Sequence, residues 1–156
     1  MRWSRANLLH SRGRLESVKI KDIIARSRSP IVRVQASDTV LSVVQQLKQS
    51  RVGAVLVMER SGKAVTGIFT ERDLCDLFLR EIDLKTTTVG DEMSTNVVTA
   101  APEMTAADAI KLLLDNGINH LPVADFVGDA IDDDSRISHI LTSNDILSFL
   151  LTAEKQ

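Results

Sequence analysis

Two short stretches of the sequence place a threonine three residues before an aspartate, where an apolar, β-branched run gives way to a helix-like pattern. The first holds Thr70 and Asp73, and the second holds Thr142 and Asp145. A helix N-terminus with a hydroxyl beside it favours a phosphate, because the free N–H groups and the helix dipole attract an anion. A nearby carboxylate accepts hydrogen bonds from both hydroxyls of a ribose. Each stretch therefore predicts a pocket for a nucleoside phosphate.

The same spacing also occurs in helix capping, which needs no ligand. A threonine at the N-cap accepts a hydrogen bond from an early helical N–H, and an acid three residues later is favoured by the positive helix end. Thr105 and Asp108 have this spacing before another predicted helix, where only a cap is expected. The two candidate sites are therefore open to both interpretations, a ligand site or a cap.

Other reactive residues give weaker signals. Cys75 falls one turn into the helix that contains Asp73, where ordinary helix packing is favoured over a reactive thiol. The acidic run in residues 129–134 lacks the glycine and the closing glutamate of a calcium loop, so we expect a solvated hairpin and no metal site. The sequence has no Ser/His/Asp order, no glycine-rich phosphate loop and no Cys/His metal pattern, so we predict no catalytic residue.

A repeat positions these residues. Both halves follow the order β-α-β-β-α, with an amphipathic lead-in before the first strand. The predicted segments of the first half are 18–25, 31–34, 40–47, 54–58, 65–69 and a helix from residue 70. Those of the second half are 89–93, 97–99, 106–113, 120–123, 136–141 and a helix from residue 142. A unit of about 60 residues buries little surface alone, so we expect the two halves to form one α/β body.

Composition excludes several classes of protein. The chain has 156 residues, a net charge of −2, one tryptophan, four phenylalanines, no tyrosine and one cysteine. So few aromatic residues, without a positive excess, leave little to bind nucleic acid. No apolar run approaches the ~18 residues of a membrane-spanning helix. The single cysteine excludes an internal disulfide.

Charge is distributed unevenly along the chain. Residues 1–15 carry a net charge of +4, residues 16–87 carry +3 and residues 88–156 carry −9. The basic opening stretch is expected to be a disordered leader, although it also has the composition of the end of an organelle transit peptide. We therefore predict a cytoplasmic protein, with a mitochondrial or plastid location as the alternative.

The ordered motifs of both halves resemble a tandem pair of cystathionine-β-synthase (CBS) domains, a Bateman module. The resemblance covers roughly residues 18–152. Its motifs lie at residues 67–74, 89–94, 118–123 and 140–146. It implies a first CBS domain over residues 16–87 and a second over 88–156, after the leader 1–15. It also implies two repeats packed through their sheets with pseudo-twofold symmetry, often in a homodimer.

The resemblance further implies clefts for an adenosyl ligand, which is AMP, ADP, ATP, S-adenosylmethionine or NAD. By position in the motif, the two threonines would meet phosphate or ribose, and the two aspartates would hold the ribose hydroxyls. Asn119 and His120 occupy the place where the family often has phosphate-contacting side chains, with a structural histidine as the alternative for His120. The implied ligand-binding residues are Thr70, Asp73, Asn119, His120, Thr142 and Asp145.

The two clefts differ in sequence. The family has a small residue shortly before the end of the last strand of each half. This residue is Gly67 in the first half, but the second half has His139 there. We expect the histidine ring to narrow the second cleft or to add a hydrogen-bond donor to it. Ala54 stands where the second half has His120, and it has no polar group. The positive first half favours an anionic ligand, whereas Asn119 and His120 favour the second cleft, so neither cleft is preferred.

We therefore predict a regulatory module that binds an adenosine nucleotide and acts on a separate, unidentified protein partner. Ligand binding would shift an equilibrium between two arrangements of the repeats. The alternative is a ligand-free structural module that dimerises. An enzyme is not predicted, no cofactor is required, and neither nucleic acid nor a membrane is expected as a partner.

Overall fold

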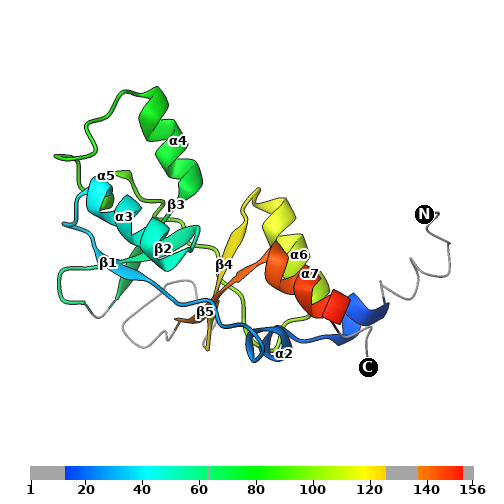
Figure 1. Cartoon of the computed structure of the whole chain (residues 1–156). Coiled ribbons are helices and arrows are strands. Elements are labelled where there is room, and N and C mark those ends of the chain that lie inside the picture. Colours follow the sequence, from blue (N-terminus) through cyan, green and yellow to red (C-terminus); the bar gives the residue numbers. More distant parts are fainter. Residues whose placement is uncertain (1–12, 63, 126–136, 153–156) are drawn as a thin grey trace. The chain divides into compact units, whose positions relative to one another are not determined.

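The computed structural model describes residues 13–62, 64–125 and 137–152. The chain divides into two compact units, whose elements are shown in Figure 1. The unit that contains Asp73, called the Asp73 unit, consists of residues 29–97 and 128–138. The unit that contains Asp145, called the Asp145 unit, consists of residues 1–28, 98–127 and 139–156.

The Asp73 unit is built on a three-stranded sheet in the order β1-β2-β3, with β1 and β2 parallel and β2 and β3 antiparallel. Its elements are β1 (Arg33–Gln35), α3 (Val40–Ser50), β2 (Ala54–Met58), β3 (Val65–Thr70), α4 (Glu71–Leu79) and α5 (Val89–Glu92). All of β2 is buried, which explains its continuous run of apolar residues. Gly62, at φ 74°, supplies the left-handed conformation between β2 and β3.

The helix α3 shows how local sequence and core packing agree. The Ser42 N–H donates to Thr39 Oγ1 over 3.3 Å and satisfies one of the free N–H groups at the helix start. Val40, Val43 and Leu47 lie at helical spacing and are buried in the core that also contains Phe69. The predicted amphipathic helix is therefore present, with its apolar face in the core.

The Asp145 unit has a two-stranded sheet, β4-β5. Its elements are α2 (Ile20–Ile24), α6 (Ala106–Asp115), β4 (His120–Ala124), β5 (Ile137–Thr142, of which 139–142 belong to this unit) and α7 (Ser143–Thr152). The strand predicted over residues 97–99 does not form. The Val97 N–H donates to Thr95 O in a tight turn, and only Ala100 pairs in parallel with Val123.

The short helix that precedes the strands of each repeat belongs to the compact unit of the other repeat. Helix α2, from the start of the chain, buries Ile20 and Ile23 in the core around Leu121 and Leu141. Helix α5, from the second half, buries Val89 in the core of the Asp73 unit. The sequence repeats and the compact units are thus composed differently, because each short lead-in covers the apolar face of the other repeat.

The structure describes the last three residues of the expected leader, 13–15. Residues 13–17 are helical, and Leu15 packs against the core of the Asp145 unit. The other leader residues (1–12) and the acidic run in 129–134 lie outside the described residues. Among the helices that the structure describes, none is long and apolar enough to span a membrane.

Candidate functional site

The first predicted site lies where β3 ends and α4 begins. The carboxylate atom Asp73 Oδ2 accepts two hydrogen bonds from Thr70, one from its N–H (2.7 Å) and one from its hydroxyl (2.8 Å). Both side chains are half-buried. The second carboxylate oxygen, Oδ1, has no hydrogen-bond partner among the described residues. Asp73 therefore keeps one oxygen available to a ligand hydroxyl.

The second site has the same local geometry where β5 ends and α7 begins. Asp145 Oδ2 accepts hydrogen bonds from the Thr142 N–H (2.8 Å) and hydroxyl (2.6 Å), and the Asp145 N–H donates to Thr142 Oγ1 over 3.2 Å. Here, however, Ser27 Oγ donates to Asp145 Oδ1 over 3.3 Å. Both carboxylate oxygens are thus engaged, and the two sites differ in their free hydrogen-bonding capacity.

The control pair, Thr105 and Asp108, makes the same local contacts. Asp108 Oδ2 accepts from the Thr105 N–H (3.0 Å) and hydroxyl (2.6 Å), and these hydrogen bonds lower the pKa of Asp108. The Asp108 residue is exposed, whereas Asp73 and Asp145 are half-buried. The hydrogen bonds inside each pair are therefore those of a helix cap, and burial is what sets the two candidate sites apart.

Asn119 and His120 lie at the start of β4. Asn119 is exposed, and His120, the first residue of the strand, is half-buried. In the Asp73 unit the register pairs Ala54 directly with Thr70, so the corresponding start of β2 lies beside the threonine of that site. Ala54 is buried and offers no side-chain hydrogen bond there. His120 and Ala54 therefore each begin a strand, and of the two only His120 has a polar side chain; its contact with a ligand stays a prediction.

His139 stands out in the Asp145 unit. Its side chain is buried, with 5% of the residue exposed, and Nε2 has no hydrogen-bond partner among the described residues. Burial lowers the pKa of His139, and the negative charge of Asp145 partly offsets this effect. The sequence predicted that this ring narrows the cleft or adds a donor. The structure shows a buried imidazole at this position, and its effect on the cleft stays a prediction.

Gly67, the counterpart of His139, has a packing role. A Cβ atom at this position would lie 2.9 Å from the backbone oxygen of Ser94 and would also clash with the Met93 side chain. The missing side chain lets Ile68 and Ser94 exchange two backbone hydrogen bonds, of 3.0 and 2.9 Å. The glycine is therefore explained by the close approach of the chain segment that follows α5.

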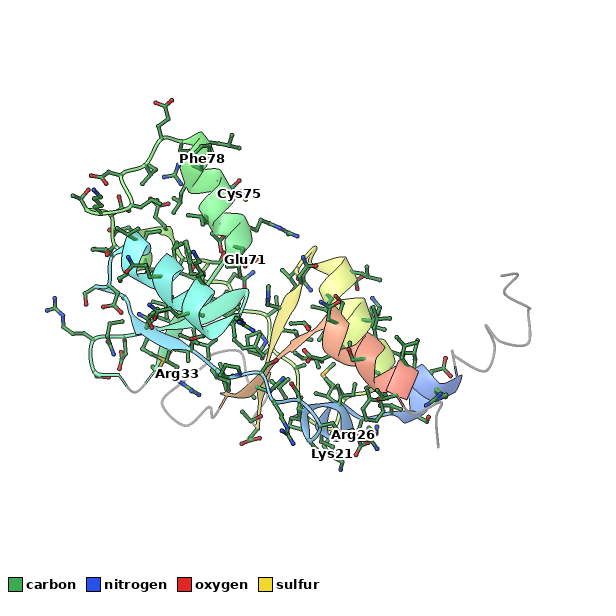
Figure 2. The ribbon with its side chains drawn as sticks, in the orientation of Figure 1. Lys21, Arg26, Arg33, Glu71, Cys75 and Phe78 are labelled. Carbon is green, nitrogen blue, oxygen red and sulfur yellow. The ribbon has the colours of Figure 1, made fainter. Side chains whose placement is uncertain are left out.

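Two features of the Asp73 unit were not anticipated. Cys75 was expected to pack within the helix, but it is exposed on α4, and Figure 2 shows it between Glu71 and Phe78 along that helix. An open pocket of about 460 Å³ also lies in this unit, and none of the six predicted binding residues lines it. Its lining residues are Ala36, Ser37, Arg60, Thr88, Gly90, Asp91 and Met93. They come from three separate segments, so no local motif indicates the pocket.

Comparison with known proteins decides the family. The CBS domain family model matches residues 20–80 and 89–152. The chain belongs to the CBS-domain family. It is a tandem CBS pair with the α/β CBS fold in two repeats, so the family and the fold predicted from the motifs are confirmed.

Two curated relatives illustrate the range of CBS proteins similar to this chain. Protein MJ1426 of Methanocaldococcus jannaschii is 29% identical, over 87% of this chain and 93% of its own length. The mitochondrial CBS domain-containing protein CBSX3 of Arabidopsis thaliana is 38% identical, over 55% of this chain and 44% of its own length. The first of these matches covers nearly all of both proteins.

Solved CBS structures share the fold. Protein ATU1752 of Agrobacterium tumefaciens has a TM-score of 0.72 at 24% identity, over 85% of this chain and 92% of its own. Protein PAE2072 of Pyrobaculum aerophilum, solved with AMP, has a TM-score of 0.69 at 17% identity, over 89% and 100%. The CBS pair of MJ0100, solved with 5′-methylthioadenosine and S-adenosyl-L-methionine, has a TM-score of 0.68 at 20% identity, over 88% and 98%.

Proposed function

We propose that this CBS pair is a regulatory module that binds an adenosyl ligand and controls a separate protein partner. The observation that supports the proposal most directly is the half-buried Asp73 carboxylate at the N-terminus of the nine-residue helix α4. Its Oδ1 atom has no hydrogen-bond partner among the described residues. A carboxylate oxygen in such a place is satisfied by a ribose hydroxyl, and the helix N-terminus beside it favours a phosphate. Two proteins of the same fold were solved with AMP or with S-adenosyl-L-methionine.

Each of the six predicted residues has a role in this proposal. The hydroxyls of Thr70 and Thr142 hold the aspartates in place and face the ligand, while Asp73 and Asp145 accept from the ribose. Asn119 and His120 at the start of β4 contact the phosphate of the ligand in the second cleft. The ligand is AMP, ADP, ATP, S-adenosylmethionine or NAD. Ligand binding favours one of two arrangements of the repeats, and this arrangement alters the activity of the partner protein. The module itself catalyses no reaction.

Exposed apolar side chains support a protein–protein role, and we propose a homodimer. Phe78 and Leu79 at the end of α4 are 80% and 79% exposed, and Leu147 and Leu151 on α7 are also exposed. Leu79 and Leu151 hold equivalent positions in the two repeats, so both halves present an apolar side chain at the same place. A contiguous exposed apolar patch is typical of an interaction surface, and we propose that these side chains contribute to one in the homodimer.

The alternative, a structural module without a ligand, has one observation in its favour. The hydrogen bonds within the Thr70–Asp73 and Thr142–Asp145 pairs are the same as those of the exposed cap formed by Thr105 and Asp108. If the two aspartates act only as caps, the clefts are vestigial. The half-burial of both aspartates favours the ligand-binding proposal over this alternative, as does Asp73 Oδ1, which has no hydrogen-bond partner in the part of the chain that the structure describes.

A thermal-shift screen of the purified chain separates the two functions. The ligands are AMP, ADP, ATP, S-adenosylmethionine and NAD, each at millimolar concentration with and without magnesium. A ligand at 100 times its Kd stabilises the folded state by about 2.7 kcal/mol, which raises the Tm of a chain of this size by roughly 5–10 °C. An increase with at least one ligand supports the sensor. No increase with any of them supports the structural module.

A further inference from the structure

The open pocket of about 460 Å³ in the Asp73 unit lies away from the predicted ligand site of that unit. Its volume is in the range of small-molecule sites in proteins. In the sheet, Ala54 pairs with Thr70 at one end of β2, and Met58 pairs with Val65 at the other end. The segments that follow β1 and β2 form part of the pocket lining. The pocket therefore lies at the opposite end of the sheet from the Thr70–Asp73 site.

Backbone hydrogen bonds hold the walls of this pocket together. The Ala36 N–H donates to Met58 O over 3.0 Å, which ties the segment after β1 to the end of β2. The Gly90 N–H donates to Ala36 O over 2.9 Å, and the Val89 N–H donates to Asp38 O over 2.8 Å. A Cβ atom at Gly90 would lie 2.8 Å from Ala36 O, so the glycine allows α5 to approach this closely. The pocket is therefore formed without a ligand, which lowers the ordering cost of binding.

The polar lining of the pocket has one positive and one negative side chain. Arg60, two residues after β2, has no side-chain hydrogen bond or ion pair in the part of the chain that the structure describes. Asp91 on α5 accepts a hydrogen bond from the Thr88 hydroxyl on Oδ2, while its Oδ1 has no partner among the described residues. The exposed Ser37 adds a second hydroxyl to the lining. The lining thus offers a ligand a guanidinium, a carboxylate oxygen and two hydroxyls.

These two charges favour a ligand that carries both signs. A guanidinium binds a carboxylate through two parallel N–H groups. A carboxylate oxygen accepts from an ammonium group, which has three N–H donors. A simple anion is attracted by Arg60 but repelled by Asp91, and a simple cation meets the reverse. A zwitterion satisfies both residues, and Ala36 and Met93 in the lining offer apolar contact to the rest of the ligand.

We propose that this pocket binds a free α-amino acid with an apolar side chain. Arg60 binds the carboxylate of the amino acid, Asp91 Oδ1 accepts from its ammonium group, and Met93 packs against its side chain. The site goes beyond the proposed adenosyl ligand and shares none of the six residues assigned to that ligand. The Asp73 unit thus has two sites for two classes of small molecule, at opposite ends of one sheet.

The test begins with the unmodified chain and two-dimensional NMR of its backbone amides. The probes are glycine, L-alanine, L-valine, L-leucine, L-methionine and L-phenylalanine, each titrated to millimolar concentration. At least one probe should shift the amide signals of the lining residues Ser37, Gly90 and Met93 in a saturable way. The amide signal of Thr70, at the other end of the sheet, should stay unchanged. If no probe shifts the lining signals, the proposal is overturned, whether or not an adenosyl ligand binds.

Analogues of the best probe separate its two charges without changing the protein. For L-leucine they are 3-methylbutylamine, which lacks the carboxylate, and 4-methylpentanoate, which lacks the ammonium group. Each analogue should bind at least about tenfold more weakly than the amino acid, because it lacks a hydrogen-bonded charged group and leaves one lining charge without a partner. An analogue that binds as tightly as the amino acid would show that the pocket does not select a zwitterion.

Two variants assign the charges to their residues. Arg60→Gln and Asp91→Asn each remove one charge but keep a hydrogen-bonding side chain, and each should weaken binding of the best probe by about tenfold or more. Lys48→Gln and Asp76→Asn make the same changes of charge at exposed positions outside the pocket lining and should leave the affinity unchanged. Unchanged affinity in either pocket variant would overturn the proposal. AMP should bind Arg60→Gln as it binds the unmodified chain, so the two sites are tested separately.

Discussion

Ser27 Oγ and Asp145 Oδ1 lie 3.3 Å apart, although the two residues are 118 positions apart in the sequence. This contact makes the two Thr-x-x-Asp sites chemically different. Asp145 has hydrogen bonds on both carboxylate oxygens, whereas Asp73 has hydrogen bonds only on Oδ2 among the described residues. A ribose hydroxyl meets no competing donor among the described residues at Asp73 Oδ1, whereas at Asp145 Oδ1 it must share the oxygen with Ser27. We therefore expect the Asp73 site to bind nucleosides more tightly.

The first prediction concerns the Asp73 carboxylate. Asp73→Ala should weaken binding of the best adenosyl ligand at its tighter site by about tenfold to a hundredfold, because hydrogen bonds from the ribose hydroxyls to a charged group are lost. Isothermal titration calorimetry measures the affinity. Asp108→Ala is the matched control, because it removes the same cap contacts at an exposed helix start and should leave the affinity unchanged. Equal effects of the two substitutions would show that Asp73 is only a cap.

The second prediction concerns the Ser27 hydroxyl. In the Asp73→Ala chain, Ser27→Ala should strengthen binding at the Asp145 site by about threefold, because the ligand no longer competes with the serine hydroxyl for Asp145 Oδ1. Ser17→Ala is the control, since the Ser17 hydroxyl donates to the backbone oxygen of Arg14 and to no other group among the described residues. Weaker binding after Ser27→Ala would show instead that the serine hydroxyl contacts the ligand.

The third prediction concerns the dependence of stability on pH. Burial lowers the pKa of His139 in the folded state below its usual 6.5, so the unfolded chain binds more protons between the two pKa values. The free energy of unfolding should therefore fall as the pH is lowered from 7.5 through 6.5, down to the folded pKa. Urea denaturation at a series of pH values measures this fall. His139→Gln should remove part of it, while a fall of the same size in that variant would assign it to other groups.

The fourth prediction concerns the close approach at Gly67. Gly67→Ala places a Cβ atom 2.9 Å from Ser94 O, a backbone atom, and against the Met93 side chain. We expect a loss of about 1–3 kcal/mol in the free energy of unfolding, which is usual for overpacking. Gly13→Ala is the control, because a Cβ atom there meets nothing within 4 Å. A destabilisation no larger than that of the control would contradict the packing role of Gly67.

The fifth prediction concerns self-association through the exposed apolar residues of α4 and α7. The unmodified chain should be a dimer by light scattering coupled to size exclusion, and Leu79→Asp combined with Leu151→Asp should make it monomeric. Both leucines are exposed, so the fold should survive, as far-ultraviolet circular dichroism will show. Lys48→Asp, on the exposed side of α3, controls for the change of charge. A dimer that persists in the double variant would place the interface elsewhere.

The sequence by itself determined the features that depend on neighbouring residues. The repeat of strands and helices follows from apolar periodicity, as in α3, where Val40, Val43 and Leu47 share one face. The Thr–Asp contacts at the two sites span three residues and form wherever a helix begins at that threonine. Local periodicity and capping chemistry are encoded within a few residues, so they could be predicted without knowing where distant segments lie.

Only the tertiary structure decided which distant segments meet. Helix α2 packs with the second half because Ile20 and Ile23 bury their apolar surface in its core. The local sequence does not indicate which core these two side chains enter. The same packing brings Ser27 to Asp145 and so makes the two carboxylates unequal. Hydrophobic burial is not directional, so the apolar pattern shows that a face is buried but not which surface covers it.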